Sequence, residues 1–163
     1  MSQAPNSAMK EIYAALESAS VDLYGFSLVL HGGGGQFAEP AVLDTLLLGL
    51  ENHWFTENDA GSLSHEEFRE DFFRSLWERC RGAKGQVMLG TEVPLGHDEM
   101  AFYQLPQVAR AALYLRVRKR FSYAGVAQTL GTGEGVVREE IERAREFLLG
   151  RRLKSVEWAE EDF

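Results

Sequence analysis

The fold is decided by residues 105–149, LPQVARAALYLRVRKRFSYAGVAQTLGTGEGVVREEIERAREFLL. Apolar residues recur at helical spacing in three parts of this stretch, which predicts three helices. The first opens at Pro106, a short second one starts near Ser122, and the third follows a Gly-Thr-Gly turn at Gly131. Gly131 can take the left-handed backbone conformation that ends a helix. The pattern predicts a helix-turn-helix, a motif that commonly presents its second helix to the DNA major groove.

This stretch resembles region 4 of bacterial sigma factors, especially the small extracytoplasmic-function type. The matching residues follow the family's order: Leu105-Pro106, Phe121-Ser122-Tyr123, Val126-Ala127, Leu130-Gly131, Gly135 with Val137, and Arg143-Ala144-Arg145-Glu146. The resemblance implies a transcription regulator that binds duplex DNA through its third helix. It places Glu134, Val136 and Arg138 nearest the base edges, whereas Ser122, Tyr123, Arg143 and Arg145 would hold phosphates.

The charge is divided unevenly along the chain. Residues 1–101 hold 6 Lys/Arg and 16 Asp/Glu, a net charge of −10, whereas residues 102–154 hold 11 Lys/Arg and 5 Asp/Glu, a net charge of +6. A basic module suits nucleic acid. Its cluster of four cations, residues 116 and 118–120, has an alternative interpretation as a solvated helix end. Glu139 and Glu140 stand where sigma factors usually carry basic or small polar residues, and carboxylates repel phosphates at short range.

The amino-terminal half also reads as helices, so we expect an all-α fold. Apolar spacing predicts helices over about residues 7–30, 40–54 and 64–81, the last with Ser64 and Glu67 as a capping box. We divide the chain into an acidic helical domain (1–81), a Gly-rich linker (82–100), the helix-turn-helix module (101–154) and an acidic tail (155–163). The tail either frays or folds back onto the basic module.

Residues 71–77, DFFRSLW, resemble the end of sigma region 2.2, the helix that docks on RNA polymerase. Phe72, Phe73, Leu76 and Trp77 are therefore candidate protein-binding residues, with an ordinary core helix as the alternative. In sigma factors a basic aromatic helix follows and melts the promoter. Residues 82–100 hold no aromatic residue, so a complete sigma factor is not expected.

The residues favour no enzyme. A glycine run follows His31, but the chain has neither a Gly-x-Ser-x-Gly elbow nor a Gly-Lys-Ser/Thr phosphate loop. The four histidines are scattered, and Cys80 is the only cysteine. We expect no catalytic residue, metal, cofactor or small-molecule substrate. With no signal peptide and no membrane span, we expect a cytoplasmic protein.

Two hypotheses remain open. The first is a sigma-factor-like regulator that binds double-stranded DNA. The second is an interaction module with a sigma-like fold that binds RNA polymerase, an anti-sigma factor or another regulator through its acidic half. The charge of residues 102–154 favours the first, and Glu139 and Glu140 favour the second.

Overall fold

The computed structural model describes residues 3–33, 35–51, 65–82 and 97–161, and these residues form helices joined by turns, with no strand among them. The all-α prediction is confirmed. In chain order the elements are α1 (Gln3–Leu30), α2 (Gly35–Glu51), α3 (His65–Cys80), α4 (His97–Tyr103), α5 (Gln107–Leu113), the π-helical turn η1 (Tyr114–Arg118), α6 (Tyr123–Leu130) and α7 (Glu134–Glu161).

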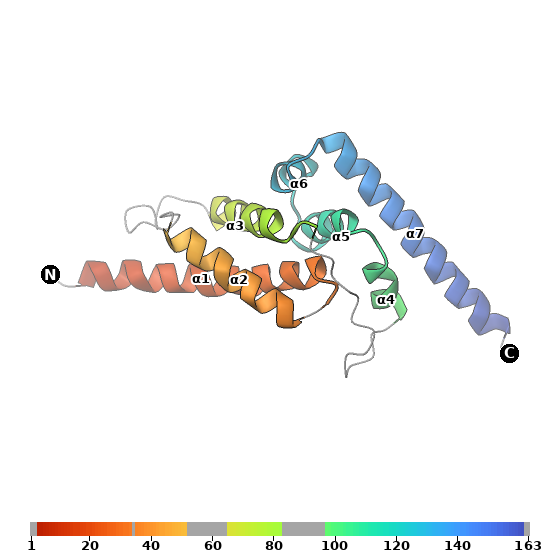
Figure 1. The fold of residues 1–163 in the computed structure, drawn as a ribbon, viewed down its shortest axis with the longest axis horizontal. Helices are drawn as coiled ribbons and strands as arrows, with labels where there is room; N and C mark the ends of the chain where they lie inside the picture. The colour runs from red at the N-terminus through yellow and green to blue at the C-terminus, as the bar shows by residue number, and fades with distance from the viewer. Residues whose placement is uncertain (1–2, 34, 52–64, 83–96, 162–163) are drawn as a thin grey trace.

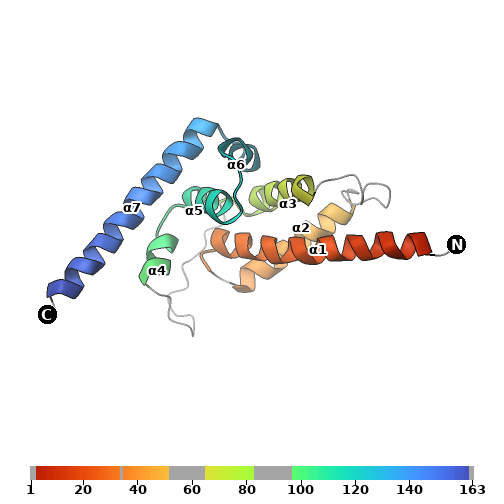
Figure 2. The same ribbon diagram turned by 180° about the vertical axis from the view of Figure 1, so that it is seen from behind.

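The helices are arranged around α5, which lies near the centre of the molecule (Figure 1). The long helix α1 and the shorter α2 run antiparallel, and α3 packs against both. On the other side of α5, α6 and α7 form the helix-turn-helix. In both views α7 continues as one helix away from the rest of the molecule (Figure 2).

One hydrophobic core joins the two halves of the chain. It contains Phe26 and Phe73 from the amino-terminal helices and Leu115, Val126 and Ile141 from the carboxy-terminal ones, all at most 2% exposed. The Phe73 ring contacts the Phe26 ring edge to face, with centroids 5.2 Å apart. The two halves are therefore not separate cores, and the domain limits that the sequence suggested remain a prediction.

A buried guanidinium ties α5 to the ends of α1 and α4. Arg110 is 6% exposed, and its Nε donates to the Val29 carbonyl at 3.0 Å and its Nη2 to the Leu30 carbonyl at 3.3 Å. Its Nη1 donates to the Tyr103 and Leu105 carbonyls, both at 3.1 Å. Burial lowers the pKa of Arg110 from its ordinary value. Because the last carbonyls of a helix lack intrahelical donors, Arg110 caps α1 from a distant part of the chain.

Gln107 makes a second set of such bonds one turn earlier on α5. Its Nε2 donates to the carbonyls of Leu30 at 3.1 Å and Cys80 at 3.0 Å, and its Oε1 accepts from the Gly82 amide at 2.9 Å. The carboxy-terminal ends of α1 and α3 are thereby held on one helix.

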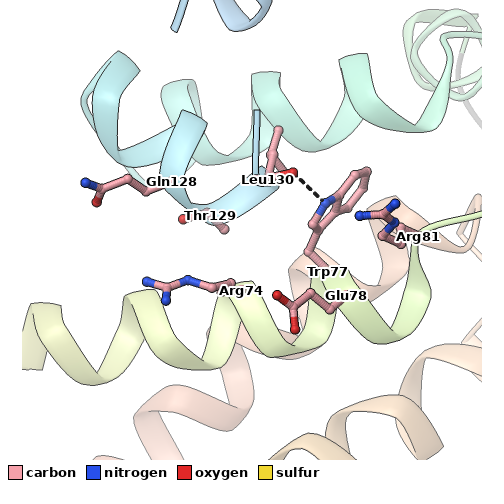
Figure 3. Close-up of a pocket in the computed structure, with 8 residues that line it drawn as sticks. Arg74, Trp77, Glu78, Arg81, Gln128, Thr129 and Leu130 are labelled. Carbon is pink, nitrogen blue, oxygen red and sulfur yellow. Dashed lines mark hydrogen bonds between the residues drawn. The ribbon is translucent and has the colours of Figure 1, made fainter. Parts of the chain in front are cut away.

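The contact between α3 and α6 is also polar at its edge. The Trp77 indole Nε1 donates to the Leu130 carbonyl at 3.1 Å, as Figure 3 shows. Beside this bond lies an open groove of about 430 Å³, whose lining includes Arg74 and Glu78 of α3 and Arg81 directly after it. The groove follows the line where the two halves of the chain meet.

Several local expectations differ from the structure. Pro40, expected in the first turn of its helix, is the sixth residue of α2. The i,i+4 spacing of Glu70 and Arg74 predicts an ion pair between them, but Arg74 lies 3.9 Å from Asp71 in an exposed ion pair. The capping residue Ser64 lies outside the described residues.

Both ends of the carboxy-terminal module also differ. The last part of the expected linker is helical, because α4 begins at His97. The expected tail is not folded back, because α7 runs unbroken through Glu161 and leads away from the basic residues near its start (Figure 1).

Candidate nucleic-acid interface

Local sequence signals set both ends of α6. Ser122 is the N-cap, with φ −65° and ψ 160°, and its Oγ accepts a hydrogen bond from the Gly125 amide at 3.0 Å. Gly131 ends the helix in the left-handed conformation, with φ 65° and ψ 37°. The Thr132 amide then donates to the Ala127 carbonyl at 3.0 Å, which is the 6→1 hydrogen bond of a Schellman motif. The predicted turn between the two helices is confirmed.

Two arginines enclose the ring of Tyr123, the first residue of α6. The guanidinium of Arg138, from α7, lies 4.1 Å from the centroid of the Tyr123 ring, and that of Arg116, from η1, lies 4.4 Å from it. Arg116 Nη1 also donates to the Phe121 carbonyl at 3.0 Å, and Arg138 Nη2 lies 3.1 Å from Glu134 Oε1. This arrangement, the arginine–tyrosine stack, fixes two cations beside the amino-terminal end of α6.

The π-helical turn explains why Arg116 reaches this place. In η1 the Lys119 amide donates to the Tyr114 carbonyl, and the Phe121 amide donates to the Leu115 carbonyl. Arg120 takes a positive φ of 59°, which is unusual for a residue with a side chain. The chain thus turns sharply before α6. The sequence placed Arg116 in a basic cluster but gave no sign that it would stack on Tyr123.

The helix α7 buries one side and exposes an acidic one. Val137, Ile141 and Ala144 are at most 2% exposed and occupy the inward positions of successive turns. The opposite side carries an acidic stripe of three exposed residues, Glu139, Glu142 and Glu146.

The predicted DNA-contacting residues of α7 are all exposed, but they lie on two flanks of the helix. Helical spacing puts Glu134, Arg138 and Arg145 on the flank toward Tyr123, and Val136 and Arg143 on the other. The structure brings Ser122, Tyr123, Glu134 and Arg138 together, but it does not bring Arg143 or Arg145 to them.

The four candidate protein-binding residues lie in the core. Phe72, Phe73 and Leu76 are at most 1% exposed and Trp77 is 7% exposed, because this side of α3 packs on α1 and α6. Their burial agrees with the core-helix alternative, although Trp77 also lines the groove beside α6, and their binding of a protein partner remains a prediction.

The described residues contain no group of three or more His, Cys, Asp or Glu side chains that could hold a metal ion. None of the described helices has the length and apolar content needed to cross a membrane.

Comparison with known families identifies the carboxy-terminal module. Residues 99–148 match the family described as sigma-70, region 4. The resemblance seen in the sequence is confirmed there, and the match begins within α4, two residues before the expected start of the module at residue 101.

The whole fold is similar to that of the sigma factor RpoE from Bartonella quintana, solved in complex with the anti-sigma factor NepR. The TM-score is 0.64 at 20% sequence identity, over 87% of this chain and 96% of that chain. No curated protein matches the sequence. The chain is therefore sigma-factor-like in its fold and in its carboxy-terminal module.

Proposed function

We propose that this chain is a sigma-factor-like transcription regulator that binds duplex DNA through α6 and α7, and that it is not a complete sigma factor. The observation that carries the proposal is the arginine–tyrosine stack on a region-4 helix-turn-helix. A docked helix-turn-helix contacts base edges with the first residues of its second helix, and phosphates lie beside the first helix.

The stack would supply the phosphate contacts. Arg116 and Arg138 are held in place by the Tyr123 ring, so little side-chain freedom is lost when they meet a phosphate. The Arg138 side chain is 58% exposed, and among the described residues it forms an exposed ion pair with Glu134. A phosphate can replace that carboxylate at small cost, because exposed ion pairs contribute little.

The acidic stripe sets the expected strength of binding. Glu139, Glu142 and Glu146 project from the same helix that would enter the groove. The proposed binding is therefore weak and steeply dependent on salt, with the stack offsetting the repulsion from the stripe.

The proposal that this chain is not a complete sigma factor rests on the sequence of residues 82–100, which follow the amino-terminal helices. Residues 82–100 contain one Lys, no Arg and no aromatic residue. Such a segment offers no Phe, Tyr or Trp ring for stacking and a single Lys for the phosphates of unpaired bases.

The test is a fluorescence-anisotropy titration of the full chain with random duplex DNA at low and moderate salt. We expect salt-dependent binding, with Arg116→Ala and Arg138→Ala each weakening it and lowering the salt slope by about one. Arg79→Ala is the matched control, because Arg79 is an exposed arginine of α3 that pairs with Asp44 at 3.3 Å.

A variant designed to bind DNA more tightly distinguishes a native chain that binds DNA weakly from one that does not bind DNA. Glu139→Ser with Glu140→Arg restores family-like residues and should strengthen binding at low salt. If neither the native chain nor this variant binds, the proposal is wrong.

The second candidate is a protein-interaction module that does not read DNA. The acidic stripe is the observation that favours it, since carboxylates facing outward from a recognition helix suit a basic protein surface better than phosphates. The similar sigma factor RpoE was solved with an anti-sigma factor, and a partner of that class would suit this alternative.

A further inference from the structure

An exposed row of leucines runs along α2. Leu43 and Leu47 are each 56% exposed and Leu50 is 44% exposed, and their spacing of four and three residues places them on one side of the helix. The buried residues of α2, Ala38, Val42, Thr45 and Gly49, occupy its other side. The leucines therefore take no part in the core.

Two tyrosines of α1 extend this apolar surface. Tyr13 is 64% exposed and Tyr24 is 40% exposed, and they lie three turns apart on the same side of α1. The Tyr24 hydroxyl lies next to the start of α2, 3.1 Å from where a Cβ on Gly35 would stand. Because α1 and α2 pack against each other and cross in both views (Figures 1 and 2), we call these five residues the α1–α2 apolar face.

Large apolar side chains that are exposed on neighbouring helices commonly mark a binding surface where they gather. Leucines at this spacing on a helix match the apolar stripe of a second helix packed along it.

The charges around the face define its partner. α2 contains Glu39, Glu51 and Asp44 and no Lys or Arg, and of these Asp44 is paired with Arg79 of α3. On α1, Glu17 is exposed between the two tyrosines and Lys10 is exposed one turn before Tyr13, so the acidic residues lie mainly along α2. We infer that the α1–α2 apolar face binds one amphipathic helix of a partner protein, with an apolar stripe flanked by Lys and Arg side chains.

A second copy of this chain is a poorer occupant. Packing two copies of α2 together would bring the acidic residues of both helices into contact, and like charges oppose such a complex. A helix that carries Lys and Arg would instead be attracted to these acidic residues. This inference goes beyond the DNA binding proposed above, and its test does not involve DNA.

The test uses the full chain and two labelled synthetic peptides of about 18 residues, long enough to form several helical turns. Both carry leucines at helical spacing, one with Lys and the other with Glu at all remaining positions. We expect the Lys peptide to bind in a fluorescence-anisotropy titration and the Glu peptide not to bind.

Two substitutions show where the peptide binds. Leu43→Ser with Leu47→Ser should weaken binding of the Lys peptide at least about tenfold, because the apolar contacts are lost. Leu149→Ser removes a leucine of matching exposure, 59%, from α7 and should change nothing. Glu39→Lys with Glu51→Lys should reverse the preference between the peptides.

Equal binding of the Lys peptide to the native chain and the double-serine variant would overturn the inference, as would absence of binding to the native chain. Sedimentation equilibrium tests the other occupant. A native dimer that the double-serine variant turns into a monomer would assign the face to a second copy. Leu47→Ala alone replaces the double variant if circular dichroism shows that the latter is unfolded.

Discussion

Replacing Arg110 by Met should destabilise the whole chain and not only the carboxy-terminal module. Methionine keeps the apolar stem and most of the length of the side chain, but it removes the donors to four carbonyls, those of Val29, Leu30, Tyr103 and Leu105. Three of these bonds are buried.

The size of the effect follows from those bonds. A buried polar group left without its partner costs about 1–3 kcal/mol, and the loss is partly offset because the charged guanidinium no longer has to be desolvated. Leu30 also keeps its bond from Gln107. We therefore expect the free energy of unfolding to fall by about 3–5 kcal/mol, a large part of the roughly 5–15 kcal/mol typical of a domain.

Urea unfolding followed by circular dichroism at the helix band measures this loss. Arg118→Met, at an exposed arginine of the π-helical turn, is the matched control and should change the free energy of unfolding by less than about 0.5 kcal/mol. Arg110→Lys retains the charge but cannot span the same acceptors, so it should recover only part of the loss. A loss below about 1 kcal/mol for Arg110→Met, at an unchanged denaturant slope, would refute the argument that Arg110 caps α1.

Three further outcomes test other contacts. Trp77→Phe removes the bond to the Leu130 carbonyl and should lower the free energy of unfolding by about 1–2 kcal/mol in the same assay, so an unchanged midpoint would contradict that bond. Gly131→Ala should cost about 1–2 kcal/mol through its φ of 65° alone, because no atom lies within 4 Å of the added methyl group, and a neutral result would contradict the turn geometry. Burial raises the pKa of the Cys80 thiol from 9.0 to about 11, against a smaller opposite effect of Arg79, so a disulfide reagent should label the native chain far more slowly than the unfolded one at pH 8. The folded chain binds the thiol proton more tightly than the unfolded chain does, so this group lowers stability as pH rises from about 9 to about 11, and fast native labelling would contradict its burial.

The sequence predicts best the features that depend on neighbouring residues. Ser122 as a cap and Gly131 as a left-handed end follow from the chemistry of single residues and a short spacing. Pro40 shows the limit of such rules. A proline in the first turn loses nothing, but one at the sixth position costs a hydrogen bond, which the exposed side of α2 tolerates.

The contacts that join the halves could not be predicted from spacing. Arg110 lies on α5 among apolar residues, and nothing local indicates that its acceptors are carbonyls 80 and 81 residues earlier. Trp77 finds its acceptor 53 residues later, at Leu130. For the same reason the aromatic side of α3 was open to interpretation as a docking surface, because periodicity shows which side is apolar and not what covers it.

The capping of α1 by α5 also bears on how the chain is made. A ribosome releases α1 long before α5, and at about 5–20 residues per second roughly 80 residues take about 4–16 seconds. During that interval the last carbonyls of α1 have no donor from Gln107 or Arg110, and the inner sides of α1 and α3 have no carboxy-terminal helices to cover them. We therefore expect a nascent chain arrested before α5 to be prone to aggregation, because its apolar inner sides lack the helices that cover them in the folded chain.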